Sequence, residues 1–234
     1  MGIVFFAVRE EAAPWLERRR RAGDAVRRMQ SALDRVMGWE VGGHRVWVTG
    51  MGGVRAVRAA QQALEEEVDW VLTCGFAGGL NPGMSVGTVI HEADPWFPKA
   101  VDWAGAGSVP GNFHCADRVA VTVGEKAALR TSTRADAVEM ESGMIRELCR
   151  ARGIPGGTVR VISDGADRDL PLDFNALMTA DHRMDYGRLA MTLVRSPGRV
   201  PDLMRFRRDL TGAADRLAGV LDGVVSGMAG ERSV

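Results

Sequence analysis

The chain has 234 residues, of which 46% are hydrophobic and 26% charged, a balance typical of a globular protein with a substantial core. Its 30 Lys and Arg residues equal its 30 Asp and Glu residues, so net charge gives no reason to expect a nucleic-acid partner. No segment approaches the roughly 20 apolar residues of a membrane-spanning helix, and the first apolar run is too short and too soon acidic for a signal peptide.

Cysteine and histidine usage argues against disulfides and metal sites. Cys74, Cys115 and Cys149 are odd in number and lack metal-ligand spacing, so we expect free thiols and a cytoplasmic location. The four histidines are scattered singly (His44, His91, His114 and His182). We therefore expect neither a bound metal nor a cofactor.

In chain order, apolar strands alternate with helices. Continuous apolar runs predict strands over residues 3–8, 41–49 (with a turn at 42–43), 69–74 and 86–91. A polar helix begins at Arg9, helical spacing predicts a second helix over 54–67, and residues 94–112 have the Pro, Gly and Trp content of a loop.

The second half of the chain continues this alternation. We predict strands over 119–123 and 158–162, a helix over 137–151, and two helices after Asp185 that are separated near 196–198. With no internal repeat and no linker, residues 1–234 are predicted to form one domain. The alternation predicts a three-layer α/β/α fold around a mixed, mostly parallel sheet.

Four predicted strands end in residues suited to chemistry. These segments are Glu10-Glu11, Gly50 to Gly53, Gly75 to Gly79, and Ser163-Asp164. In such sheets, ligands bind beyond the carboxyl ends of the strands. The sequence therefore predicts a cleft at one edge of the sheet.

Each acid also has a purely structural interpretation. Glu141 lies beside the apolar stripe of its predicted helix, where a carboxylate is costly unless it is functional or paired, for instance with Arg160. Asp164 could equally be a helix N-cap or an Asx-turn residue. Glu11 could simply be a first-turn acid that the helix dipole favours.

The glycine clusters likewise have two interpretations. Their backbone N–H groups could cradle a phosphate or a ribose, or they could form tight turns. Gly50-Met51-Gly52 matches half of a dinucleotide-binding fingerprint, but Arg55 occupies the position of the third glycine. We therefore discount a nicotinamide-dependent dehydrogenase.

Two motifs carry a family resemblance. Residues 138–142 (Val-Glu-Met-Glu-Ser) and 159–167 (Val-Arg-Val-Ile-Ser-Asp-Gly-Ala-Asp) resemble the purine nucleoside phosphorylase and nucleosidase superfamily. Within it, the methylthioadenosine/S-adenosylhomocysteine nucleosidases are the nearest well-known branch. Residues 166–171 and 195–201 resemble a narrower group, the hopanoid-associated phosphorylases, which are proposed to release adenine from adenosylhopane.

The resemblance implies roles for individual residues. Asp164, oriented by Ser163, would be the acid that protonates N7 of the purine, and it must be shielded from water to do so. Glu11 would position or deprotonate the attacking water, and Glu141 would hold the ribose hydroxyls. The other implied substrate-binding residues are Met140, Glu139, Gly52, Phe76, Ala77 and Gly78.

Two departures bear on the reaction. Thr73 and Phe76 stand where phosphorylases of this superfamily carry an arginine and a serine for phosphate, which favours water as the nucleophile. We therefore predict an adenine-releasing nucleosidase. Its substrate is expected to carry a bulky apolar 5′ group, which could be a lipid. The alternatives are a nucleosidase for small substrates and a non-catalytic nucleoside binder.

The resemblance also implies a homo-oligomer.

The sequence contains two arginine runs, Arg18 to Arg21 and another at Arg205, Arg207 and Arg208. We interpret both first as solvated helix faces. The alternative interpretation is peripheral contact with a membrane surface.

Overall fold

The computed structural model describes residues 1–31, 36–98, 101–179 and 185–229. Its strands are β1 (Gly2–Phe6), β2 (Val26–Met29), β3 (Met37–Val41), β4 (His44–Val48), β5 (Trp70–Gly79), β6 (Val89–Ala93), β7 (Val109–Pro110), β8 (Phe113–Cys115), β9 (Ala137–Glu139) and β10 (Gly156–Asp164). Its helices are α1 (Arg9–Arg21), α2 (Gly53–Ala63), α3 (Val123–Thr133), α4 (Ser142–Ala151), α5 (Phe174–Leu177), α6 (Tyr186–Arg195), the 3₁₀ turn η1 (Pro197–Arg199) and α7 (Val200–Ala229).

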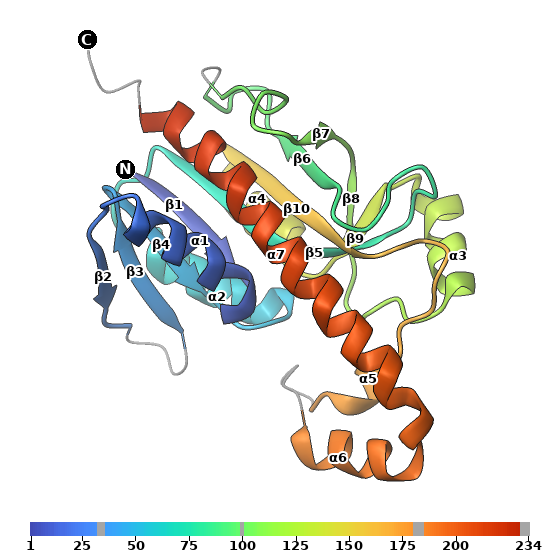
Figure 1. The fold of residues 1–234 in the computed structure, drawn as a ribbon. Helices are drawn as coiled ribbons and strands as arrows, with labels where there is room; N and C mark the ends of the chain where they lie inside the picture. Colours follow the sequence, from blue (N-terminus) through green and yellow to red (C-terminus); the bar gives the residue numbers. More distant parts are fainter. Residues whose placement is uncertain (32–35, 99–100, 180–184, 230–234) are drawn as a thin grey trace.

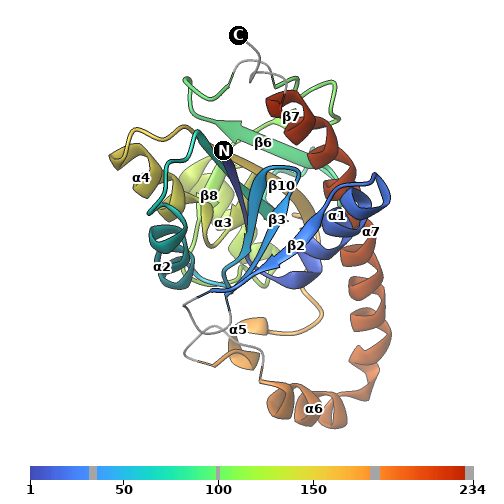
Figure 2. The same ribbon diagram turned by 90° about the vertical axis from the view of Figure 1, so that its left-hand side faces the viewer.

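The strands form one mixed sheet in the order β2-β3-β4-β1-β5-β10-β6-β7, with β9 pairing on β5 and β8 on β9. The four central strands, β4, β1, β5 and β10, run parallel, and β6 joins them antiparallel. Helices cover both faces, so the predicted three-layer α/β/α architecture with a mixed, mostly parallel sheet is confirmed (Figures 1 and 2).

Alternation along β1 shows how the two layers form. Val4 and Phe6 point into a core shared with α1 and α7, whereas Ile3 and Phe5 point into a core shared with α2 and α4. All four side chains are buried, as expected for a central strand covered on both faces. Because β1, β5 and β10 run parallel, their carboxyl ends meet at one edge of the sheet.

Three predicted elements differ from the structure. Residues 119–123 are not a strand: Val119 to Thr122 form a loop and Val123 begins α3. The helix predicted over 137–151 is divided into strand β9 and helix α4, with Glu141 as the residue just before the helix. The glycines at 75–79 do not close a turn, because β5 continues through them to Gly79.

Other predictions lie partly outside the described residues. Residues 99–100 of the predicted loop and His182 are among those not described. In the described part of the chain, no group of three or more His, Cys, Asp or Glu side chains is arranged to hold a metal ion. None of the described helices combines the length and the apolarity needed to cross a bilayer.

The C-terminal helix α7 covers one face of the sheet and then extends past it. Its C-terminal half buries Ala213, Leu217, Leu221 and Val224 against the sheet. None of residues 200–212 is buried. Together with α6 and η1, this exposed half projects below the rest of the molecule in both views (Figures 1 and 2).

Gly75 is required where β5 passes between two charged side chains. A Cβ at this position would lie 2.5 Å from Glu11 Oε1 and 2.7 Å from Arg160 Nη1, and its φ of +150° is one that other residues rarely adopt. We expect Gly75→Ala to lower the free energy of unfolding by about 1–3 kcal/mol through overpacking, measured by denaturant titration.

The matched control is Gly212→Ala in α7, where nothing lies within 4 Å of the added methyl group. Because alanine is the better helix former, this variant should be unchanged or more stable by up to about 1 kcal/mol. Equal stability of the two variants would contradict the required close approach at Gly75.

Candidate active site

Glu11 lies at the start of α1, directly beyond the end of β1. Its Oε2 accepts hydrogen bonds from the backbone N–H groups of Ala7 (2.9 Å) and Val8 (3.1 Å), and its Oε1 accepts one from Phe76 (2.8 Å). Burial raises the pKa of this carboxyl to about 7, although the Arg160 charge and these N–H groups act in the opposite direction. Glu11 is thus suited to exchange a proton near neutral pH.

Arg160 is a fully enclosed cation in the middle of β10. Its Nη2 lies 2.8 Å from Glu139 Oε2 and 3.3 Å from Glu141 Oε2, and its Nη1 donates to the Phe76 carbonyl at 3.3 Å. Arg160 and both acids are buried. The ion pair that the sequence offered as an alternative role for Glu141 therefore exists, and it includes a second acid.

The two acids around Arg160 have different environments. Glu139 also accepts from the backbone N–H groups of Glu141 (2.9 Å) and Ser142 (2.7 Å) and from the Ser142 hydroxyl (2.8 Å), which fixes the start of α4. Although burial acts to raise it, the pKa of Glu139 is held below its usual range by Arg160 and these donors. Glu139 therefore stabilises the start of α4, and its predicted contact with substrate stays a prediction.

Glu141 is less strongly stabilised as an anion. Besides Arg160, it accepts one hydrogen bond, from the backbone N–H of Gly52 at 2.9 Å. Burial, offset in part by Arg160, raises the pKa of Glu141, and the charge of Glu139 raises it further. Gly52 therefore acts by holding Glu141, and Glu141 retains capacity for a further donor.

Asp164 ends β10 and is held by two donors. The Ser163 hydroxyl donates to its Oδ1 at 2.6 Å, as the sequence predicted, and Lys126 Nζ lies 2.6 Å from its Oδ2. The Lys126 side chain is completely buried and also donates to the carbonyls of Gly165 (2.7 Å) and Arg168 (2.8 Å). Asp164 is therefore not an isolated acid, because a buried ammonium faces one of its oxygens.

One cavity brings the three predicted catalytic acids together. Its volume is about 180 Å³, and Glu11, Glu141 and Asp164 all form part of its wall. The rest of the wall comes from Ala7, Val8, Met51, Phe76, Ala77, Gly78, Arg118, Val119, Ala120, Val138, Glu139, Met140 and Arg160. Four predicted substrate-binding residues lie in this wall: Met140, Phe76, Ala77 and Gly78. Gly52 and Ser163 are not part of the wall and instead donate hydrogen bonds to Glu141 and Asp164.

A second, larger cavity of about 1080 Å³ shares Asp164 with the first. It lies between residues 82–86, the 163–171 loop and the exposed half of α7. Its apolar lining includes Met84, Val86, Leu170, Pro171 and Phe206. Asp164 thus stands between a small acidic cavity and a wide one in which apolar side chains alternate with charged ones, among them Arg168, Arg205 and Asp209.

Sequence reasoning missed Lys126 and the extent of Arg160's contacts. Lys126 lies in α3, in a segment whose start was predicted as a strand. The motif Thr122-x-x-Glu125, a capping box that begins this helix, was the available indication of a helix.

Comparisons with known proteins place this site in context. Residues 4–91 and 103–195 match the phosphorylase superfamily. A 5′-methylthioadenosine/S-adenosylhomocysteine nucleosidase of Shewanella oneidensis is 27% identical over 163 residues, covering 55% of this chain and 69% of that protein.

Solved structures share the fold. Futalosine hydrolase of Helicobacter pylori superposes with a TM-score of 0.68 at 18% identity, covering 96% of this chain and 97% of that one. The 5′-methylthioadenosine/S-adenosylhomocysteine nucleosidase of the same organism, bound to butyl-thio-DADMe-Immucillin-A, gives 0.68 at 19% identity with the same coverage.

The contacts of Arg160 predict a large loss of stability when its charge is removed. Arg160→Met leaves Glu139 and Glu141 buried without their cation, so unfolding should become easier by about 3–5 kcal/mol. Adding Glu139→Gln should recover part of this loss, because it removes one unpaired charge. Thermal and denaturant unfolding would measure both variants.

The control is Arg18→Met, which breaks the half-exposed ion pair with Asp222 (2.7 Å). An exposed pair contributes about 0–1 kcal/mol. A similar effect of the two arginine variants would show that the Arg160 cluster does not stabilise the fold in the way inferred.

Proposed function

The chain belongs to the phosphorylase superfamily, as its motifs predicted, and we propose that it is an enzyme that cleaves the N-glycosidic bond of a purine nucleoside. We further propose that adenine is the base released and that water is the nucleophile. The observation that carries this proposal is the single cavity walled by Glu11, Glu141 and Asp164.

The acidic cavity suits the charge that develops on the sugar. Breaking the bond between ribose and a purine leaves positive charge on the sugar, as in glycoside hydrolysis. Two buried acids, Glu139 and Glu141, share a single cation, Arg160. Fixed negative charge beside a developing cation stabilises the transition state more than the neutral ground state. Oε1 of Glu141 accepts from the Gly52 N–H and Oε2 from Arg160, and a carboxylate oxygen can accept a further hydrogen bond, here from a ribose hydroxyl.

Asp164 is proposed to act on the base. Its carboxyl forms the wall between the two cavities, and Ser163 and Lys126 fix both of its oxygens. A purine leaves more easily when its N7 receives a proton, which Asp164 would deliver or stabilise there. Lys126 would hold the carboxyl in place and balance its charge once the proton has moved.

Glu11 is proposed to act on the nucleophile. Three backbone N–H groups hold its carboxylate at the cavity wall. With a pKa of about 7, it can accept a proton from a water molecule that attacks the sugar.

Three features support water over phosphate. Thr73 is buried and directs its hydroxyl to Thr158 and to the Gly157 carbonyl, away from the cavity. Phe76 contributes an apolar side chain to the cavity wall. Arg160 is already occupied by Glu139 and Glu141, so it has little capacity to bind a phosphate ion.

The larger cavity supports a bulky substrate. The acidic cavity, at about 180 Å³, is smaller than the roughly 300–1,000 Å³ common for small-molecule sites. The adjoining space of about 1080 Å³ has apolar side chains, among them Met84, Leu170 and Phe206, between the charged residues of its wall. We propose that it receives an apolar 5′ substituent, as on an adenosylhopane-like substrate. We also propose a cytoplasmic location and a homo-oligomeric assembly.

Free adenine provides the test of this function. The protein is incubated with methylthioadenosine, and separately with adenosine carrying a long alkyl chain at the 5′ position, each with and without phosphate. We expect adenine release from the alkyl compound without phosphate. Asp164→Asn retains an oxygen for Lys126 and should still bind substrate, whereas its turnover should fall by about 10²–10⁴-fold.

Each alternative has its own outcome. Release from methylthioadenosine alone would favour a small-substrate nucleosidase, and release that requires phosphate would overturn the choice of water. Absence of release from every adenosine derivative, with binding retained, would favour a non-catalytic nucleoside binder. Normal turnover of Asp164→Asn would refute the role of this residue.

The pKa of Glu11 predicts the pH dependence of the reaction. As a base, Glu11 must be ionised in the free enzyme, so kcat/KM should rise with pH through about 7. Glu11→Gln should lose most of the activity and with it this rise. A flat profile across neutral pH in the wild-type enzyme would contradict the assignment.

A further inference from the structure

A helical arm, defined here as residues 186–209, stands apart from the main body of the protein. It comprises α6, η1 and the first part of α7, and none of its residues is buried. A few polar contacts tie it to the body, among them Arg199 Nη1 to the Pro171 carbonyl (3.2 Å) and Asp185 N to the Leu177 carbonyl (2.8 Å).

The outer side of α6 is apolar although it faces solvent. Met191 and Val194, three residues apart and therefore neighbours on the helix surface, are 53% and 79% exposed, and Tyr186, the first residue of the helix, is 76% exposed. Leu189 and Leu193, by contrast, are half-buried. Part of the apolar surface of this helix therefore remains exposed to solvent.

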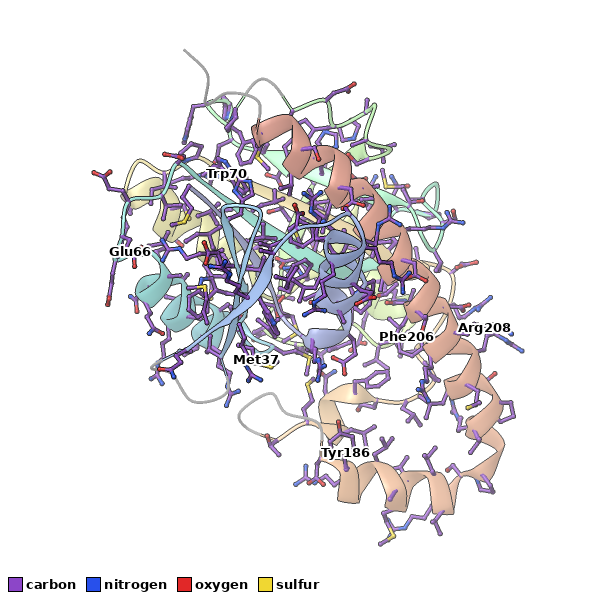
Figure 3. All side chains as sticks on the ribbon, turned by 60° about the vertical axis from the view of Figure 1, so that its left-hand side comes forward. Met37, Glu66, Trp70, Tyr186, Phe206 and Arg208 are labelled. Carbon is purple, nitrogen blue, oxygen red and sulfur yellow. The ribbon has the colours of Figure 1, made fainter. Side chains whose placement is uncertain are left out.

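The first turns of α7 repeat this arrangement. Val200, Met204 and Arg208 follow one another at four-residue spacing, so they share the outer face with Arg207. Met204 is 62% exposed. Figure 3 shows Arg208 pointing away from the body, while Phe206 lies on the inner side of the helix, where its ring packs on Phe174 at 5.6 Å.

The arm is basic although the chain as a whole is neutral. Six arginines and two aspartates give residues 186–209 a net charge of +4, against a total of +0 for the chain. No acid occurs between Tyr186 and Pro201. Within the described part of the chain, Arg195, Arg207 and Arg208 have no carboxylate within 4.0 Å.

The other arginine run behaves differently. Arg18 pairs with Asp222 (2.7 Å), Arg19 pairs with Asp24 (2.5 Å), and Arg21 pairs with Glu17 (3.2 Å). These charges are therefore paired with acids of α1, of the turn that follows it and of α7. Of the two runs noted in the sequence, the one in the arm alone combines unbalanced charge with exposed apolar side chains.

We propose that the helical arm docks the protein on the surface of an anionic phospholipid bilayer. Exposed apolar side chains bordered by arginines are what an interfacial helix needs, because the apolar groups enter the headgroup region while the guanidinium groups meet lipid phosphates. The bilayer therefore fits both the apolar and the basic character of the surface.

Docking would also bring the larger cavity to the lipid. Arg199, Arg205 and Phe206 belong both to the arm and to the wall of this cavity. This consequence rests on the proposed function: an apolar 5′ substituent could then enter the cavity from the bilayer. The docking itself requires no substrate and can be tested alone.

The test is co-sedimentation of the full chain with vesicles of phosphatidylcholine, with and without phosphatidylglycerol. We expect binding to the anionic vesicles that weakens as salt is added. Val194→Glu should reduce this binding by about tenfold or more, since it replaces an inserted side chain by a charge that the lipid repels. Arg207→Gln and Arg208→Gln should each reduce it by about fivefold.

The matched control is Val109→Glu, which introduces the same charge at an exposed valine of β7, at the opposite end of the molecule from α6 (Figures 1 and 2). It should bind vesicles like the wild type. Equal binding to both lipid compositions, or unchanged binding by Val194→Glu, would overturn the proposal. So would a lack of vesicle binding together with loss of self-association in Val194→Glu, which would make the arm an interface between copies.

The same samples separate this proposal from the proposed function. Adenine release from a soluble nucleoside is measured without vesicles. Release without vesicle binding would refute docking only. Vesicle binding without release from any adenosine derivative would refute the enzymatic proposal and support docking.

Discussion

The burial of Arg160 in a central strand is the constraint on which the site depends. A guanidinium at this depth is stable only with carboxylate partners, and β10 places it where Glu139 and Glu141 reach it from the segment before α4. Its charge also lowers the pKa of Glu11, which lies just beyond the end of β1. One cation thus draws acids from two distant segments to the same edge of the sheet, and Gly75 provides the space in which Glu11 and Arg160 approach each other.

The same cluster makes chemically distinct groups out of identical side chains. Glu139 receives three donors from the start of α4 in addition to Arg160, whereas Glu141 receives one from Gly52. Glu11 has three backbone donors but is buried deeply enough that its pKa rises to about 7. The number of donors and the depth of burial, rather than residue type, therefore separate a structural anion from groups that can bind sugar or exchange a proton.

The sequence predicted the features that depend on local pattern and strand order. Apolar runs identified the parallel strands, and the residues after them identified the edge at which Glu11, Glu141 and Asp164 meet. It did not predict β9, because Ala137, Met140 and Met144 continue a helical spacing and the pairing of Val138 with Gly78 is made across about 60 residues of chain. It missed Lys126 because valines at 119, 121 and 123 resemble a strand, although Thr122 and Glu125 cap a helix there.

Lys126 changes how the Asp164 end of the site must be understood. A nucleosidase acid was expected to be shielded from water, and Asp164 is shielded, with 12% of its side chain exposed. The same shielding leaves Lys126 with no solvent, so its ammonium depends on Asp164 and on the Gly165 and Arg168 carbonyls. Those carbonyls belong to the loop that borders the larger cavity. The position of the acid and the shape of the space beside it are therefore fixed by one buried charge, just as Arg160 fixes Glu139 and Glu141.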